Sequence, residues 1–144
     1  MIKNVKEIEG EAFCQESEDV ERVREAFELL FPKRFSKLSS AHGLFGTKII
    51  IFRADIKNKP ARETTEKIIS MISENDKKEI LNSLKNRLDE TGNIYLRFNK
   101  QKAYQEKKLF LTSQDTDSIQ VVIRVETHPA TKENYLKTAG SLFS

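Results

Sequence analysis

Hydrophobic and polar positions follow strand-like patterns in several short segments of the chain. The pattern is clearest at residues 119–125, where isoleucine or valine stands at every second position. Residues 94–99 alternate in the same way, whereas residues 5–14 alternate imperfectly and residues 47–56 carry apolar side chains on both faces. Leucines at the two ends of residues 109–111 predict one more short strand. The pattern therefore predicts about five strands.

Apolar residues recur at helical spacing in the regions between these strands. They predict a helix over residues 20–30, with Ser17 as its N-terminal cap and Pro32 just beyond its end. A second helix is expected to begin near Pro60, because the first helical turn tolerates proline. A third is expected to begin at Asp76, which forms an acidic variant of the capping box with the glutamate three residues later.

Glycine and proline mark the remaining boundaries. Gly92 is expected to end the third helix, and Pro129 is expected to open a last helix near the C-terminal end of the sequence. Residues 33–46 show neither the strand-like nor the helical pattern of apolar positions, so they predict a loop. That loop closes with residues 43–46, Gly-Leu-Phe-Gly, which suit a tight turn leading into a strand.

The predicted order of elements is β-α-β-α-α-β-β-β-α, and it indicates an α+β fold. We expect a single, mostly antiparallel sheet of about five strands packed on helices. With 144 residues, the chain has the length of one domain, so residues 1–144 are predicted to form a single domain. The uncovered face of the sheet is expected to stay partly wet and to present four side chains on which RNA bases could be laid: Tyr95, Arg97, Gln120 and Arg124.

Composition favours an ordinary globular protein with a segregated surface charge. Apolar residues make up 38% and charged residues 33%, and the net charge of +3 comes from 25 basic and 22 acidic side chains. Acids crowd residues 7–28, whereas bases gather at residues 33–37 and 97–108. The lone Cys14 forms no internal disulfide, the first seven residues lack a signal segment, and the apolar run at residues 49–52 is too short for a bilayer. We expect a cytoplasmic protein that does not contact membranes.

Residues with catalytic or metal-binding chemistry form no recognisable motif. His42 and His128 lie outside any nucleophile or metal pattern. Asp115 and Asp117 start like a calcium loop but lack its glycine and distal glutamate. Residues 43–46 lack the lysine and hydroxyl of a phosphate loop. The sequence therefore predicts a protein that is not an enzyme, with no catalytic residue, no metal and no cofactor.

Residues 97–108 combine bases, amides and aromatics around a predicted strand end, a turn and the next strand. Lysine and arginine hold phosphates, amides reach phosphates or base edges, and tyrosine offers a ring for stacking. The alternative is that Tyr104 packs against the sheet while the lysines keep an edge strand soluble. The candidate RNA-binding residues are Arg97, Asn99, Lys100, Gln101, Lys102, Tyr104, Lys107 and Lys108.

Residues 95–104, Tyr-Leu-Arg-Phe-Asn-Lys-Gln-Lys-Ala-Tyr, resemble the signature of the archaeal exosome-associated RNA-binding proteins. Residues 18–23, 43–47 and 88–92 resemble other segments of that family, in the same order. The resemblance implies a fold similar to the large-subunit ribosomal protein that binds 5S ribosomal RNA, an RNA-binding role and exosome subunits as partners. Asn99 departs from the aspartate of the signature, and the glycine expected after the tyrosine is missing near Glu106.

Two functions follow from the sequence. The first is a non-catalytic RNA-binding protein linked to RNA processing or degradation. The alternative is an adaptor of a cytoplasmic complex that docks through the acidic first helix or an exposed sheet edge without touching nucleic acid. The sequence is compatible with a monomer or a homodimer.

Overall fold

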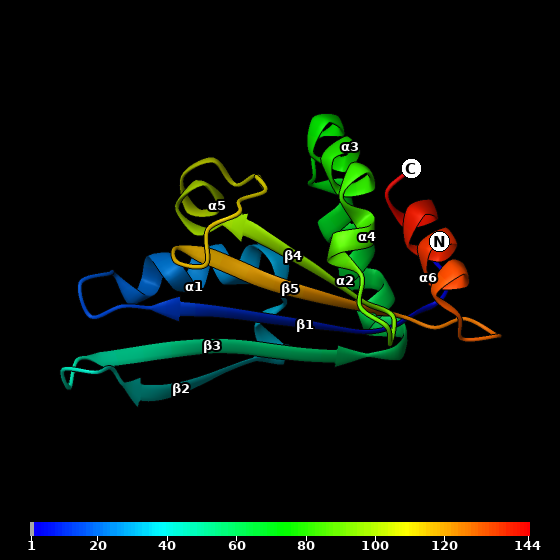
Figure 1. Cartoon of the computed structure of the whole chain (residues 1–144). Helices are drawn as coiled ribbons and strands as arrows, with labels where there is room; N and C mark the ends of the chain where they lie inside the picture. The colour runs from blue at the N-terminus through cyan, green and yellow to red at the C-terminus, as the bar shows by residue number, and fades with distance from the viewer. Residues whose placement is uncertain (1) are drawn as a thin grey trace.

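One antiparallel sheet of five strands runs through the protein, in the order β2-β3-β1-β5-β4. A computed structural model describes residues 2–144. Strand β1 lies at the centre, and β2 and β4 form the two edges (Figure 1). The strands are β1 (Val5–Cys14), β2 (Ser36–His42), β3 (Lys48–Lys57), β4 (Asn93–Asn99) and β5 (Ser118–Val125). The expected α+β fold with a single antiparallel sheet is confirmed.

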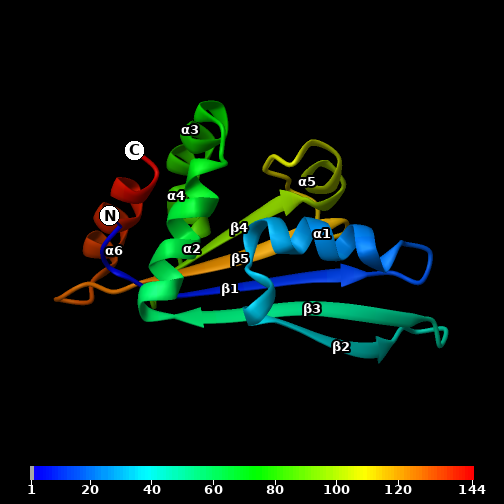
Figure 2. The ribbon, with the colours of Figure 1, turned by 180° about the vertical axis from the view of Figure 1, so that it is seen from behind.

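Within residues 2–144, six α-helices and one short 3-10 helix accompany the sheet. Helices α1 and α2 lie on the same side of it, as seen from behind in Figure 2. Helices α3, α4 and α6 gather towards one end of the molecule, and α5 lies at the other end, beside the end of β4 (Figure 1). They are α1 (Val20–Leu30), η1 (Lys33–Phe35), α2 (Asn58–Ser70), α3 (Glu74–Asn82), α4 (Leu84–Arg87), α5 (Lys100–Glu106) and α6 (Lys132–Leu142).

Aromatic rings of α1 and β3 fill the core between helices and sheet. The ring of Phe27 stacks on Phe31, with centroids 5.0 Å apart, and lies 5.8 Å from Phe52. Phe31 reaches so far onto β1 that a Cβ atom at Gly10 would lie 2.1 Å from its Cε2 atom. Glycine is therefore required at this point of the central strand, because any side chain there would collide with the ring.

The caps of two helices differ from those predicted, and the last helix begins at Lys132 and not at Pro129. Asp19 caps α1 in place of Ser17, and its carboxylate accepts a hydrogen bond from Glu21 N at 2.9 Å. Ser73 caps α3, so that helix begins before the predicted Asp76. The carboxylate of Asp76 accepts instead from Leu111 N at 3.2 Å, a contact between segments distant in sequence.

Residues 88–92 form a turn that separates α4 from β4. The carboxylate of Asp89 accepts hydrogen bonds from Thr91 N and Asn93 N, each at 2.9 Å, and from the Tyr95 hydroxyl at 3.0 Å. Burial acts to raise the pKa of Asp89, but these hydrogen bonds outweigh it and hold that pKa well below its usual range. Gly92, at φ 90°, belongs to this turn, whereas the preceding helix already ends at Arg87.

The prediction of a loop over residues 33–46 is wrong. Strand β2 occupies residues 36–42 and pairs with β3 along its whole length. Most of its side chains are exposed, so the segment has no hydrophobic alternation from which a strand could be recognised. The strand is defined by its backbone pairing with β3 and not by a pattern of buried side chains.

The prediction of a strand at residues 109–111 is also wrong. Helix α5 follows β4 directly, because the Asn99 side chain accepts from Lys102 N at 2.9 Å and caps it. Leu109 and Leu111 make only isolated bridges, with Ile72 and Phe98. Strand β2 takes the place of this strand in the count of five. Among residues 2–144, no helix is both long enough and apolar enough to cross a membrane.

Candidate nucleic-acid interface

The predicted RNA-binding residues occupy the end of β4, helix α5 and the two residues after it. Arg97 lies on the sheet face that α1 and α2 leave open, and Asn99 is the cap of α5. Gln101 and Lys102 are exposed on α5, and Lys108 is exposed beyond its end. The candidates therefore point to two different parts of the surface, the sheet face and the helix.

Lys100 is buried, with only 4% of its surface exposed. Its Nζ donates to Phe13 O at 2.6 Å and to Glu18 Oε1 at 2.9 Å, and it lies 3.7 Å from Asp117 Oδ1. These contacts join the end of β1, the start of α1 and the turn before β5. The predicted contact between Lys100 and a phosphate is corrected to a structural role, because its ammonium group is enclosed by protein acceptors.

Two other cations of the segment also face carboxylates. Arg97 Nη1 lies 2.5 Å from Asp115 Oδ1, and Lys107 Nζ lies 3.4 Å from Glu25 Oε2. Both carboxylates come from other segments, which only the fold brings near. The basic residues of the segment 97–108 therefore do not form one continuous positive patch. Within residues 2–144, Lys102 and Lys108 form no ion pair with a carboxylate.

The ring of Tyr104 is partly buried against the core and is bordered by two cations. The guanidinium carbon of Arg22 lies 5.4 Å from its centroid, and Lys107 Nζ lies 4.8 Å away. Lys102 Nζ makes a similar contact, 4.7 Å from the ring centroid of Phe110. Tyr104 thus combines the two alternatives left by the sequence, since it packs against the core and also keeps part of its ring at a cationic surface.

A cleft of about 320 Å³ separates the start of α1 from α5. Gln101 and Tyr104 line it from α5, and Arg22 lines it from α1. The sequence does not predict Arg22 as a site residue, because nothing along the chain places α1 beside α5. Glu18 and Asp19 also line the cleft, so its charge is mixed.

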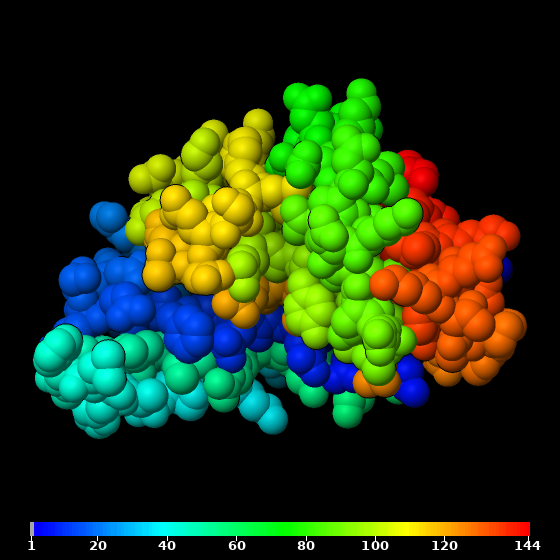
Figure 3. Space-filling view, in the orientation of Figure 1, coloured from blue at the N-terminus to red at the C-terminus, as the bar shows by residue number. Residues whose placement is uncertain are grey.

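The open face of the sheet presents the four side chains expected there. Tyr95 is 49% exposed, and a groove of about 390 Å³ between α4 and residues 112–113 is lined by Tyr95, Arg97 and Gln120. In Figure 3 this region lies between α4 (green) and the loop that precedes β5 (yellow to orange). Arg124 is exposed on the same face.

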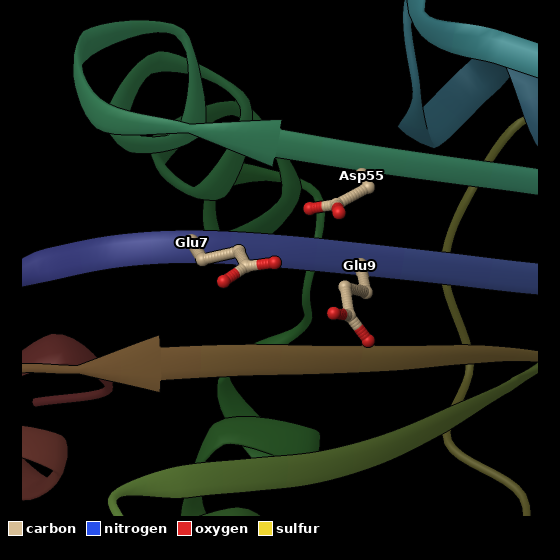
Figure 4. A group of neighbouring side chains, drawn as sticks. All are labelled: Glu7, Glu9 and Asp55. Atoms are coloured by element: carbon tan, nitrogen blue, oxygen red, sulfur yellow. The ribbon is translucent and has the colours of Figure 1, made fainter.

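The middle of this face is acidic, which disfavours the predicted use of the sheet as a platform for RNA. Glu7 and Glu9 of β1 and Asp55 of β3 each place a carboxylate oxygen within 4.8 Å of the others (Figure 4). Burial raises the pKa of Asp55, and the hydrogen bond and negative charge of Glu7 raise it further. Such a cluster repels phosphates that approach the centre of the sheet.

These three carboxylates are the side chains that could hold a cation in the described part of the chain. Carboxylate oxygens suit magnesium or calcium. Burial and the neighbouring Glu7 raise the pKa of Asp55, so protonation of Asp55 at low pH relieves part of the repulsion within the group. The group escaped the sequence reasoning because it depends on the register that sets Glu9 opposite Asp55.

Comparison with known proteins identifies the family. A family model described as RNA binding matches residues 7–126. The chain belongs to this RNA-binding family. The resemblance that residues 95–104 suggested is confirmed at this level, whereas the link to the exosome stays a prediction.

Members of the family and solved structures resemble the chain over most of its length. The RNA-binding protein PAB1135 of Pyrococcus abyssi is 36% identical over 133 residues, which cover 87% of this chain and 84% of that protein. Protein AF2318 from Archaeoglobus fulgidus has a TM-score of 0.82 and 29% identity, covering 96% of this chain and 99% of its own. Mth689, a DUF54 protein from Methanothermobacter thermautotrophicus, has a TM-score of 0.79 and 28% identity, covering 97% and 98%.

Proposed function

We propose that this protein is a cytoplasmic RNA-binding protein that acts without catalysis, and that RNA contacts α5 and the adjoining start of α1. The observation that carries the proposal is the match to the RNA-binding family over residues 7–126. The name of the Pyrococcus abyssi relative, an RNA-binding protein, supports it. A link to the RNA-degrading exosome rests on the resemblance of residues 95–104 alone.

The chemistry of α5, the two residues after it and the adjoining start of α1, here called the α5 surface, supports this choice of site. Lys102 and Lys108 are exposed and form no ion pair with the residues that the structure describes, so their ammonium groups are available to phosphates. Gln101 borders the cleft with donor and acceptor groups that suit base edges. Tyr104, flanked by Arg22 and Lys107, offers a ring and two cations within a short distance.

Exchanging the two available lysines tests the site. In Lys102→Ala/Lys108→Ala, we expect weaker RNA binding and a log–log salt dependence of affinity that is flatter by roughly one to two, because about two phosphate contacts are lost. Fluorescence anisotropy with a labelled single-stranded RNA, and with the same RNA closed into a hairpin, measures both quantities over a salt series.

The matched control exchanges two exposed lysines at the other end of the molecule. Lys132→Ala/Lys137→Ala removes the same charge from α6, which lies far from α5 (Figure 1). If the two double variants lose equal affinity and show equal log–log salt dependences, the effect of charge is general and the α5 surface is not the site. If the unaltered protein binds neither RNA, the proposed function itself is wrong.

A further inference from the structure

The longest stretch of chain without an acidic side chain lies outside the α5 surface. Residues 29–54 contain no aspartate or glutamate. They cover the end of α1, η1, β2 and most of β3, and therefore one edge of the sheet. Their basic residues are Lys33, Arg34, Lys37, Lys48 and Arg53. We call residues 36–57, the paired strands β2 and β3 with their turn, the β2–β3 hairpin.

Nearly all of these cations are free of carboxylate partners. Arg53 Nε lies 2.7 Å from Glu11 Oε2, but no other basic residue of residues 29–54 forms an ion pair within residues 2–144. Lys37 stands directly opposite Arg53 in the β2–β3 register, and Lys48 stands opposite His42 next to the turn. Strand alternation places Lys37 and Lys48 on opposite faces of the hairpin, so the unpaired charge surrounds the free edge of β2, where it attracts a polyanion.

The turn of the hairpin exposes two large apolar side chains. Leu44 is 99% exposed and Phe45 is 94% exposed. The turn is closed by its own backbone, since Gly46 N donates to Gly43 O at 3.0 Å and Gly43 N donates to Thr47 O at 2.7 Å. A positive φ of 77° at Gly46 completes it. The two side chains therefore contribute nothing to the core, and the closed turn exposes them to solvent.

The outer half of the hairpin extends past the central strand. The pairing of β1 with β3 ends at Cys14 and Ile50, so residues 43–49 have no neighbour from β1. Figures 1 and 3 show this end of the hairpin at the margin of the molecule, with β2 as the outermost strand. A ligand can thus reach both the turn and the free edge of β2.

The base of the hairpin adjoins a groove of about 640 Å³. Arg34, Lys37 and Arg53 line it together with three carboxylates, those of Glu9, Glu11 and Asp55. The guanidinium carbon of Arg34 lies 4.7 Å from the ring centroid of Phe35. Because these carboxylates repel phosphates, an anionic strand would keep to Arg34 and Lys37 and follow the free edge of β2 towards the turn.

We propose that the β2–β3 hairpin is a second RNA-binding surface, on which Lys37 and Lys48 hold phosphates and Phe45 stacks on an unpaired base. This inference rests on the proposed RNA-binding function. An exposed ring at the end of a cationic hairpin matches the combination of stacking and phosphate contacts that single-stranded RNA needs. The three exposed apolar side chains of the hairpin, Leu38, Leu44 and Phe45, are too few for the buried core of a specific protein–protein interface, so the free charge favours RNA over a protein partner.

Phe45→Ala tests the stacking contact without disturbing the core, because the ring is exposed. Using a labelled single-stranded RNA of mixed sequence, we expect the dissociation constant to rise at least fivefold, an effect of about 1 kcal/mol or more for one stacked base. Leu81→Ala, which removes another exposed apolar side chain, on α3, is the matched control and should bind as the unaltered protein does.

Lys37→Ala/Lys48→Ala tests the phosphate contacts, and Lys78→Ala/Lys85→Ala, on α3 and α4, is its control. The first pair should flatten the salt dependence by roughly one to two in log–log slope, and the second should leave it unchanged. With RNA containing 4-thiouridine, photocrosslinks are expected in residues 38–48, the tryptic segment that holds the turn.

The outcomes separate this inference from the proposed function. If the protein binds RNA but Phe45→Ala and Lys37→Ala/Lys48→Ala bind it as tightly as their controls, the hairpin is not an RNA-binding surface. In that case the proposal that RNA contacts α5 still stands. If the unaltered protein binds no RNA, both are overturned. Loss of binding in the hairpin variants with unchanged thermal midpoints supports the inference.

Discussion

Lys100 joins three segments that are far apart in the chain, and its role depends on their convergence. Its ammonium group meets a backbone carbonyl at the end of β1 and carboxylates before α1 and β5. A buried cation with these partners contributes to stability mainly through what its removal would leave behind, namely the desolvated Glu18 carboxylate and an unsatisfied carbonyl. Lys100 therefore serves the fold and not RNA binding, although it lies among basic residues in the sequence.

Lys100→Ala should destabilise the protein by about 3 kcal/mol, because one partner of a buried ion pair is removed. Urea unfolding followed by circular dichroism measures this change. Lys102→Ala, two residues along on the exposed side of α5, should change the free energy of unfolding by less than about 0.5 kcal/mol. Equal stability of the two variants would contradict the structural role of Lys100.

Cys14, beside this cluster, is the other residue whose chemistry depends on the fold. Burial raises the pKa of its thiol, and the negative charge of Glu18 raises it further, while Lys100 acts in the opposite direction. Its Sγ contacts Gln15 O at 3.6 Å and Glu18 O at 3.8 Å. Cys14 is buried, and a buried thiol that resists ionisation packs as a small core residue.

At the scale of elements, the pairing of β1 with β3 sets two carboxylates directly opposite each other. Glu9 faces Asp55, and Glu7 lies close to both. Because burial and Glu7 raise the pKa of Asp55, the folded chain holds this proton more tightly than the unfolded chain. The contribution to stability is full below the unfolded pKa of about 4 and is lost as the pH rises through the folded pKa.

Asp55→Asn should therefore stabilise the protein at pH 7 by about 0.5 kcal/mol, because like charges opposite each other across two strands are destabilising. The gain should disappear near pH 4, where the unaltered side chain is protonated. Thermal unfolding at both pH values measures it. Glu66→Gln, on the exposed side of α2, is the control and should show no gain. A gain that is equal at both pH values would point to a cause other than charge.

The elements that the sequence predicted well are those with one buried face. Helix α1 and strands β4 and β5 alternate between core and solvent, and their apolar periodicity follows from that burial. Strand β2 has little burial on either face, so its sequence predicts a loop. Helix α5 is short and charged, and its start depends on the Asn99 cap. The sequence of residues 100–106 therefore predicts a turn between two strands, where the structure has a helix.

At the scale of the whole molecule, the acidic centre of the sheet lies between two basic edges. Glu7, Glu9 and Asp55 occupy the open face, while α5 lies beyond the β4 edge and the β2–β3 hairpin forms the other edge. Both basic surfaces lie towards the end of the molecule at which β1 ends (Figure 1). An RNA strand that avoids the acidic centre can reach both by crossing this end.

Combining the two sets of substitutions tests whether one RNA engages both edges. In Phe45→Ala/Lys102→Ala, the fold-losses of affinity should multiply, because free energies add for sites that share no contacts. The loss should be visible with a long single-stranded RNA in anisotropy measurements. Binding of two short RNA molecules per protein, with no gain in affinity for a longer one, would show that the surfaces act separately.

The sequence by itself determined the α+β class, the buried strands and the main helices, because burial of one face leaves a periodic trace in the chain. It also located two clusters of basic residues. Only the tertiary structure decided which of those cations are free, since Glu18, Glu25 and Asp115 reach Lys100, Lys107 and Arg97 from distant segments. Charge compensation depends on distances in space, and these distances are set by packing.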